Sequence, residues 1–462
     1  MVESAVEPPI EVVVDVTGEK RRHILELFQH IMILNLPSNI MREECCVGFN
    51  RWRKKLPALL SQVLAVLSKE AIVTFFDSTI EGVSTMSELK RHLTVKKPDV
   101  VICTVTFKYI NWDSEIFRIC KELDIKCIVI PIPFEYAIDL VKKYDVYFAV
   151  YSEPEKTLLD WRKGTSLAEL KGIVYKDDGK VAVNPPQNPS FDKIPPIDWS
   201  SIKVKKYDSI VYQITRGCPY GCVFCEWANK RYQLKTIETV LADLQTLESY
   251  GVKQVYLLCS QITTNKKWLS EFCREKVRRG IKLLWTTDIR ANELTRALAR
   301  QMRTAGCIRV FMGVESVNEE LLQKLNKSLR LDQMIKAIKI CSEEGILINI
   351  PFMFNIGETK EQVDEYIGFL DQPLLQHSTV GTTTLHVNPG TKLFQQSHTP
   401  QKTNLIKIFK KELQKRKFKR AISRILWLFK NKNARLNLIA VLKTLDLTCL
   451  RLYSLSILKL RV

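Results

Sequence analysis

Residues 216–225 read Arg216-Gly217-Cys218-Pro219-Tyr220-Gly221-Cys222-Val223-Phe224-Cys225, directly after an apolar run at 209–214. Three thiols are separated by three and by two residues, and the glycines and proline between them favour a loop that wraps its sulfurs around one point. Thiolates are soft ligands that suit zinc or iron–sulfur clusters. A structural zinc site has four protein ligands, whereas no fourth Cys or His lies near this loop. The spacing therefore favours a [4Fe–4S] cluster with one open iron over a packed or zinc-binding loop.

Apolar runs alternate with helical patterns on the C-terminal side of this loop. The spacing predicts six strand–helix units, which is short of the eight units of a closed barrel. The predicted strands are 209–214, 253–258, 281–286, 308–313, 346–353 and 379–387.

The N-terminal part of the chain shows a similar alternation. Its apolar runs, separated by predicted helices, indicate an α/β fold with a doubly wound parallel sheet, in which ligands bind at the carboxyl ends of the strands. A turn at Asp177-Asp178-Gly179 and five prolines between Asn184 and Trp199 predict a hairpin and a linker. The predicted strands are 30–36, 71–76, 99–103, 126–130 and 146–150.

Composition and charge limit the classes of protein that fit. The 462 residues are 46% hydrophobic and 26% charged, which suits two or three folded domains and excludes a disordered chain. No run of about 18 uncharged apolar residues predicts a membrane span, and the acidic start of the chain argues against a secretory signal. Thirteen cysteines, an odd number in a large chain, are expected to be reduced in the cytoplasm.

The basic character belongs to the C-terminal region. The net charge is +20, and residues 402–462, with 17 Lys and Arg against two acidic residues, account for +15 of it. Two apolar stripes at helical spacing run through this region, with a break near 414–417. A solvated face on a packed helix, a membrane surface and nucleic acid all remain open, with nucleic acid the least favoured. The stripes are Leu405, Phe409 and Leu413, and then Phe418, Ile422, Ile425, Leu426 and Phe429, the second opposite Lys419, Arg420 and Arg424.

The cysteine loop and the strands after it resemble the radical S-adenosylmethionine enzymes. The pattern of Cys218, Cys222 and Cys225 with an aromatic residue before the third cysteine is similar to the motif of that family. Cys307 to Ser316 resembles the family's fourth strand with its Glu-Ser end, and Leu325-Asn326-Lys327 follows as it often does. Phe354 to Thr359 resembles the exit of the fifth strand, although its usual proline-glycine is altered. The resemblance implies a partial (β/α)6 barrel, a [4Fe–4S] cluster, S-adenosylmethionine and a 5′-deoxyadenosyl radical.

Candidate contacts follow from this resemblance where a position matches. The three cysteines would hold the cluster, and Tyr220 or Phe224 would flank the adenine. Ser260 and Gln261 stand where many members have Gly-Gly-Glu, which binds the amino group of the cofactor.

Three further candidates lie at the ends of the third and fourth predicted strands. Arg290 would meet the carboxylate of the cofactor, with a surface salt bridge as the alternative. Glu315 and Ser316 end a barrel strand on the face where active sites lie, with packing alone as the alternative.

The N-terminal part resembles the cobalamin-binding domain that precedes many such barrels. Residues 34–37, 57–67, 98–102 and 152–158 carry this resemblance, the last as a Gly-Glu-x-Glu stretch. The predicted strand ends make five residues candidates for cobalamin contact: Asn35, Asp77, Thr79, Gly82 and Thr104.

Two departures from that family bear on cobalamin. Thr79 stands where some members have the lower-face histidine, and Pro131-Ile132-Pro133-Phe134 replaces the usual Gly-Gly after the fourth strand. A structural domain without cobalamin is therefore the alternative.

These patterns divide the chain into four parts and define its expected chemistry. We predict a Rossmann-like domain of the cobalamin-binding type at 1–165, a linker at 166–205, the radical barrel at 206–398 and a basic helical region at 399–462. The resemblance implies methyl transfer to an unactivated carbon of a small-molecule or lipid-like substrate, with a reductant such as flavodoxin or ferredoxin.

Three rivals to this chemistry stay open. The first is a radical enzyme without cobalamin that performs rearrangement, cyclisation or oxidation. The second is a methylthiotransferase acting on tRNA, for which no second cysteine set is spaced in the N-terminal part. The third is a non-catalytic iron–sulfur electron carrier.

Overall fold

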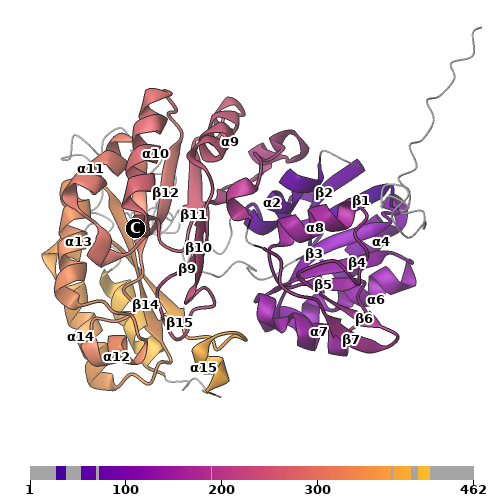
Figure 1. Cartoon of the computed structure of the whole chain (residues 1–462). Helices are drawn as coiled ribbons and strands as arrows, with labels where there is room; N and C mark the ends of the chain where they lie inside the picture. The colour runs from indigo at the N-terminus through magenta and orange to yellow at the C-terminus, as the bar shows by residue number, and fades with distance from the viewer. Residues whose placement is uncertain are drawn as a thin grey trace, which may run out of the picture.

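The computed structural model describes residues 28–37, 54–68, 72–188, 190–375, 378–396 and 404–416. They form two α/β domains side by side, an N-terminal one around a mixed sheet and a C-terminal one around a curved parallel sheet (Figure 1). Within these ranges, no helix combines the length and the apolar character needed to cross a bilayer.

The N-terminal sheet has the strand order β2-β1-β3-β4-β5-β6-β7. Strands β1 to β5 are parallel, and β6 and β7 form an antiparallel hairpin that extends the sheet beyond β5. The prediction of a doubly wound parallel sheet is confirmed for β1 to β5. The strands are β1 (His30–Asn35), β2 (Ile72–Asp77), β3 (Val100–Thr106), β4 (Lys126–Ile132), β5 (Phe148–Val150), β6 (Ile173–Asp177) and β7 (Lys180–Val183).

Helices cover both faces of this sheet, because alternate side chains of the buried strands are apolar on both sides. The range 166–205, predicted as a linker, contributes the β6–β7 hairpin to the sheet. The helices are α2 (Ala58–Leu67), α3 (Ser78–Glu81), α4 (Met86–Lys96), α5 (Ile110–Asp113), α6 (Glu115–Glu122), α7 (Ala137–Lys143) and α8 (Pro154–Arg162).

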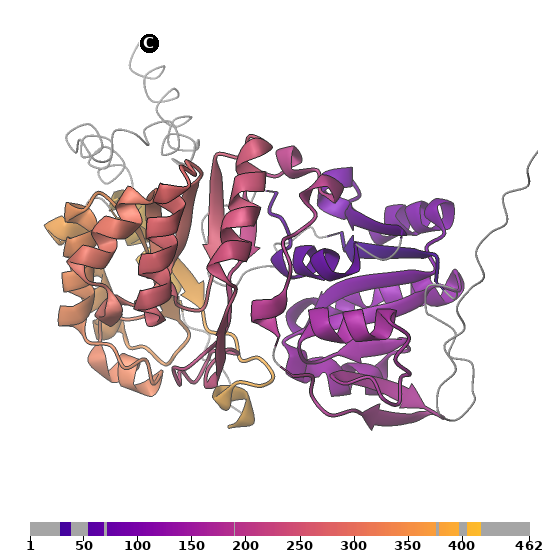
Figure 2. The same cartoon turned by 45° about the horizontal axis from the view of Figure 1, so that its top comes forward.

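The C-terminal sheet has six parallel strands in the order β15-β14-β13-β12-β11-β8. Within the described residues, β8 and β15 are its two edges, so the barrel is partial, as predicted (Figure 2). The strands are β8 (Ile210–Gln213), β11 (Gln254–Leu258), β12 (Leu284–Ile289), β13 (Cys307–Met312), β14 (Leu347–Phe354) and β15 (Thr379–Thr384). The helices are α9 (Ile237–Ser249), α10 (Lys266–Arg278), α11 (Arg296–Thr304), α12 (Glu319–Lys324), α13 (Leu331–Glu343), α14 (Lys360–Leu370) and α15 (Lys392–Gln395).

Two local details of the barrel differ from the prediction. The strand predicted at 281–286 is β12 at Leu284–Ile289, because Ile281 closes the end of α10 by donating its N–H to the carbonyl of Lys276 at 3.2 Å. The cysteine loop is the connection of an unpredicted antiparallel hairpin, β9 (Thr215–Cys218) and β10 (Lys230–Leu234).

The first part of the basic region packs on the barrel. Residues 405–416 are helical, and Phe409 is fully buried among Phe352, Phe354 and Tyr366, with ring centroids 5.2–6.2 Å apart. Leu405 and Leu413 pack against the same core, which confirms the first predicted stripe. The second stripe, 418–429, lies outside the described residues.

Candidate active site

The cysteine loop is held in place by close backbone contacts with the barrel. Gly217 has φ 73°, and a Cβ there would lie 2.0 Å from the carbonyl oxygen of Arg231, so only glycine fits. The N–H of Val223 donates to the carbonyl of Leu325 at 3.1 Å, and the amide of Asn326 donates to the carbonyl of Gly221 at 2.7 Å. The segment after α12 therefore stabilises the position of the loop.

The three thiols of the loop lie close enough to influence one another. Burial raises the pKa of Cys218 to about 11, and the neighbouring Cys222 adds to this shift. Burial also raises the pKa of Cys225 to about 12, with contributions from Cys222 and Cys218. Both thiols are therefore protonated near neutral pH in the metal-free chain, and metal binding has to displace their protons.

These thiols fit an iron–sulfur cluster better than a single metal ion. In the described part of the chain, no three His, Cys, Asp or Glu side chains converge on one metal ion. A cluster does not need such convergence, because each thiolate binds a different iron. Three neighbouring thiols on one loop are the donor set that a [4Fe–4S] cluster with one open iron requires.

Arg290, which follows β12, lies beside this loop and is not a surface residue. It is 3% exposed, so the alternative of a surface salt bridge is wrong. Its guanidinium stacks on the ring of Tyr220 at 3.7 Å and donates to the carbonyl oxygens of Lys327 and Ser328. It also lies close enough to the Cys222 thiol for the two groups to interact electrostatically. The tyrosine hydroxyl contacts the carboxylate of Glu293. Arg290 thereby places a buried positive charge against the cysteine loop.

Glu315 and Lys327 form a buried ion pair beside the same loop. The Lys327 Nζ lies 2.9 Å from Glu315 Oε1, and the two side chains are 7% and 10% exposed, in the order Lys327 and Glu315. Glu315 has φ 63°, and a Cβ on Gly313 would lie 2.8 Å from its carboxylate. Burial opposes a charge on Lys327, but the interactions with Glu315 and Cys222 together outweigh burial, so the pKa of Lys327 is raised. The ammonium also lies 5.7 Å from the centre of the Phe224 ring.

The remaining predicted cofactor contacts differ in their surroundings. The N–H of Ser260 donates to Thr215 Oγ1 at 2.7 Å, and the buried Oε1 of Gln261 has no hydrogen-bond partner among the described residues. Ser316 Oγ accepts from the hydroxyl of Tyr366 on α14 at 2.9 Å. The side chain of Ser316 is thus engaged with the outer helix layer, which matches the packing alternative.

The sequence analysis assigned no role to several buried polar residues of the barrel. It named Lys327 only as part of the motif Leu325-Asn326-Lys327. Asp288 on β12 is buried, which raises its pKa to about 7 although the hydroxyl of Tyr256 donates to it. Asn349 on β14 is 1% exposed, and both atoms of its amide lack partners among the described residues. Asn349 is a polar residue inside an otherwise apolar strand pattern. This interruption was the one feature of the sequence that could have identified it as a candidate.

The five residues predicted to contact cobalamin gather at the carboxyl ends of β1, β2 and β3. Asp77 accepts hydrogen bonds from Asn35 Nδ2 at 3.0 Å, from the N–H of Thr79 at 2.9 Å and from the hydroxyl of Tyr207 at 2.8 Å. A Cβ placed on Gly82 would have no other atom within 4 Å, and Thr104 is partly exposed. The fit to cobalamin is therefore partial, because the carboxylate of Asp77 already accepts three hydrogen bonds within the chain.

The same edge of the N-terminal sheet touches the barrel through aromatic side chains. Phe134, in the segment that replaces the usual Gly-Gly, lies 6.4 Å from Trp227 of the cysteine loop, measured between ring centroids. Phe107, which follows β3, lies 6.3 Å from Phe394 on α15. The two predicted cofactor sites therefore face each other across the contact between the domains.

Comparison with known proteins identifies the class of the barrel. Residues 212–370 match the model of the Radical SAM superfamily. An uncharacterized methyltransferase of Pyrococcus horikoshii is 26% identical over 359 residues, which cover 73% of this chain and 78% of that protein. The anaerobic magnesium-protoporphyrin IX monomethyl ester cyclase of Rubrivivax gelatinosus is 28% identical over 320 residues, covering 63% of this chain and 57% of the cyclase. The chain thus spans little more than half the length of that relative.

A solved structure shares the two-domain fold. The radical S-adenosylmethionine methyltransferase TsrM from Kitasatospora setae, with cobalamin and a [4Fe–4S] cluster bound, superposes with a TM-score of 0.64 at 18% identity. The superposition covers 79% of this chain and 77% of TsrM. Residues 212–370 therefore form a Radical SAM domain, and the chain has the two-domain fold of TsrM. The Radical SAM superfamily implies a [4Fe–4S] cluster and S-adenosylmethionine as cofactors.

Proposed function

We propose that this chain is a cobalamin-dependent radical SAM methyltransferase that acts on an unactivated carbon. The observation that carries the proposal is the juxtaposition of the cysteine loop with the carboxyl edge of the N-terminal sheet, through Trp227 and Phe134. Ligands of doubly wound sheets bind at that edge. The cluster would supply the electron that generates a 5′-deoxyadenosyl radical, and cobalamin would carry the methyl group.

Each residue of the site has a role in this proposal. Cys218, Cys222 and Cys225 hold the cluster, while Arg290 and Lys327 provide positive charge that offsets the negative charge of the thiolates. Five further residues contact S-adenosylmethionine in this proposal: Tyr220, Phe224, Ser260, Gln261 and Glu315. Of these, Gln261 has a buried acceptor that a cofactor amino group would satisfy. Ser316 has a packing role, because its hydroxyl is bonded to Tyr366.

The substrate in this proposal is a small molecule or a lipid-like molecule, and a low-potential protein such as flavodoxin or ferredoxin supplies the electron. A second candidate is radical chemistry without cobalamin, such as the cyclisation named for the Rubrivivax relative. The three hydrogen bonds that Asp77 already accepts within the chain favour this second candidate.

Titration with cobalamin separates the two candidates. The metal-free chain is expected to bind added hydroxocobalamin near equimolar ratio, and the absorption spectrum should lack the signature of a histidine ligand because Thr79 replaces that histidine. Tyr207→Phe, which removes one donor from Asp77, is expected to leave the affinity unchanged or raise it. A dissociation constant of tens of micromolar corresponds to a binding free energy of about −6 kcal/mol. If the chain does not bind cobalamin at such concentrations, the cobalamin-dependent reaction is ruled out and the cobalamin-free chemistry remains.

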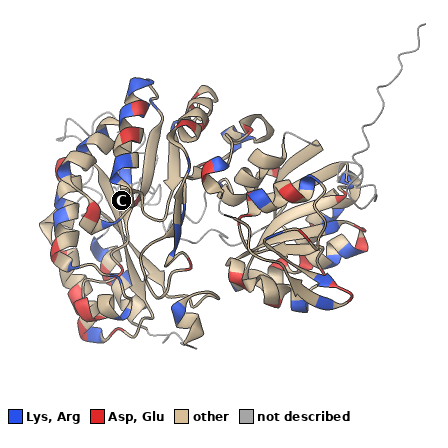
Figure 3. Ribbon diagram, in the orientation of Figure 1, with Lys and Arg blue, Asp and Glu red and all other residues tan. Residues whose placement is uncertain are grey.

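We also propose peripheral membrane contact through the basic region beyond residue 416. Charges of both signs are interspersed over the described helices (Figure 3), whereas residues 417–462 hold 11 Lys and Arg against one acidic residue, a net charge of +10. Each basic residue near an anionic bilayer contributes about 1 kcal/mol, and the apolar stripe at 418–429 would insert beside it.

Sedimentation with liposomes tests the membrane proposal. The full chain is expected to sediment with phosphatidylserine vesicles, and a chain ending at Arg416 is expected to stay in the supernatant. The cut follows Arg416 because the helix at 405–416 packs on the barrel through Phe409. Replacing Phe418, Ile422 and Phe429 by Ser should weaken sedimentation as much as removing Lys419, Arg420 and Arg424. Equal sedimentation of the full and shortened chains would refute membrane contact.

A further inference from the structure

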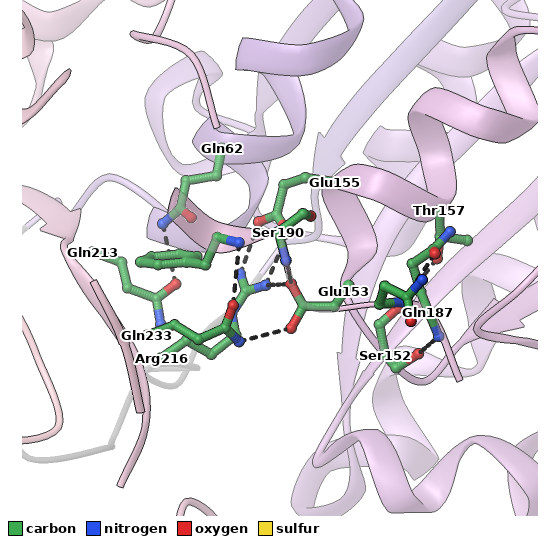
Figure 4. Close-up of polar contacts among 12 residues, drawn as sticks. Gln62, Ser152, Glu153, Glu155, Thr157, Gln187, Ser190, Gln213, Arg216 and Gln233 are labelled. Atoms are coloured by element: carbon green, nitrogen blue, oxygen red, sulfur yellow. Dashed lines mark hydrogen bonds and ion pairs between the residues drawn. The ribbon is translucent and has the colours of Figure 1, made fainter. Parts of the chain in front are cut away.

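A buried ion-pair network joins the two domains next to the cysteine loop (Figure 4). The guanidinium of Arg216 on β9 binds both carboxylate oxygens of Glu155, with N–O distances of 3.0 and 2.8 Å. It also lies 3.3 Å from Glu153 Oε2. The three side chains are 4%, 2% and 10% exposed, in the order Arg216, Glu155 and Glu153. The network is therefore withdrawn from water, where a charge that loses its partner is costly.

Glu153 lies in the turn between β5 and α8 of the N-terminal domain, and Glu155 lies in the first turn of α8. We call residues 151–155 the β5–α8 turn. Glu153 caps α8 with φ 42°, a backbone conformation that is strained for a residue with a side chain. The turn is fixed from its own side, because Ser152 Oγ accepts from the N–H of Gln187 at 2.8 Å and Thr157 Oγ1 donates to the carbonyl of Ser152 at 3.2 Å. The acceptors for Arg216 are thus held rigidly by the N-terminal domain.

The barrel side of the network is the β9–β10 hairpin. Gln233 on β10 donates to Glu153 Oε1 at 3.0 Å, beside its pairing partner Arg216 on β9. The guanidinium of Arg216 lies 4.6 Å from the ring centre of Phe191, whose N–H donates to Gln233 Oε1 at 3.3 Å. Both strands that carry the cysteine loop are consequently tied to the same turn.

We propose that Arg216 is a positioning residue, which fixes β9 and the adjoining Cys218 against the β5–α8 turn through Glu153 and Glu155. Cys218 is two residues from Arg216 on the same strand, and a displacement of the strand moves its sulfur. The placement of the cysteine loop therefore depends on the N-terminal domain as well as on the barrel. This inference rests on the proposed function only where it concerns the cluster, because the anchoring of Cys218 also holds in the metal-free chain.

Alkylation of the metal-free chain by iodoacetamide, read by mass spectrometry at each cysteine, tests the anchoring. Arg216→Met is expected to raise the alkylation rate of Cys218 about tenfold relative to Cys341, the factor that corresponds to about 1.4 kcal/mol of local stability. Arg216→Lys, which keeps the charge but loses the forked contact, is expected to give a smaller rise. Arg118→Met, which removes two exposed ion pairs in the N-terminal domain, is the matched control and should leave the rate unchanged.

The spectrum of the cluster gives a second test. A purely structural role of Arg216 would not change that spectrum. In the reconstituted enzyme, the electron paramagnetic resonance spectrum of the reduced cluster with S-adenosylmethionine should change in Arg216→Met and return towards wild type in Arg216→Lys. A wild-type alkylation rate for Cys218 in Arg216→Met, or an equal rise at Cys218 and Cys341 in both variants, would overturn the proposal. If wild-type enzyme holds no cluster while the alkylation rates behave as expected, the proposed function fails and the anchoring stands.

Discussion

Replacing Cys218, Cys222 and Cys225 together by Ala is expected to abolish cluster binding. Anaerobically reconstituted wild-type chain should hold about four irons and absorb broadly near ~400 nm, as expected for clusters held by cysteine thiolates. The variant should lose both, because its loop keeps its backbone contacts with Leu325 and Asn326 but offers no thiolate. Iron analysis together with the absorbance spectrum measures the effect.

A matched variant separates ligand loss from loss of fold. Cys273 is a buried cysteine on α10 within the hydrophobic core, and Cys273→Ala should keep the full iron content. The ligand assignment would be wrong if the triple variant retained the iron and spectrum of wild type. It would also be wrong if Cys273→Ala lost as much iron as the triple variant.

Lys327→Met is expected to lower the free energy of unfolding of the metal-free chain by about 3–5 kcal/mol, the cost of leaving one member of a buried ion pair without its partner. Glu315 would remain 10% exposed with a negative charge and no cation at 2.9 Å. For a domain of this size the loss corresponds to a fall of about 10 °C in melting temperature. Adding Glu315→Gln should recover most of the loss, because the buried charge is then removed. Thermal unfolding followed by circular dichroism measures both variants.

An exposed pair on the neighbouring helix provides the comparison. Lys324 and Glu320 on α12 are 54% and 64% exposed, so Lys324→Met should cost less than about 1 kcal/mol. If Lys327→Met is as mild as Lys324→Met, the Glu315–Lys327 pair does not carry the structural role described for it.

The sequence predicted the parts of the structure that depend on local patterns. Buried parallel strands are apolar runs in the sequence whatever strands they pair with. The sequence therefore predicted β1 to β5 and the six barrel strands. The cysteine loop was found because its three thiols are adjacent in the chain. β12 was misplaced by three residues because Gly280 and Ile281 close the preceding helix inside the same apolar run.

The contacts that the sequence did not predict join residues far apart in the chain. Arg216 and Glu155 are 61 residues apart, and the motif around each gives no sign of the other. Arg290 was expected either at the cofactor or at the surface, and its stacking on Tyr220 depends on how β12 and the cysteine loop meet. Phe134 was noted only as part of the segment that replaces the usual Gly-Gly, whereas its contact with Trp227 of the cysteine loop appears only once the two domains are placed together.

Reductive cleavage of S-adenosylmethionine tests the central claim most directly. The reconstituted enzyme, given dithionite or reduced flavodoxin, is expected to release 5′-deoxyadenosine and methionine, and the triple cysteine variant is expected to release neither. Chromatography with mass detection measures both products. If a chain with its full cluster and bound S-adenosylmethionine forms no 5′-deoxyadenosine under these reductants, the chain is an electron carrier and not a radical enzyme.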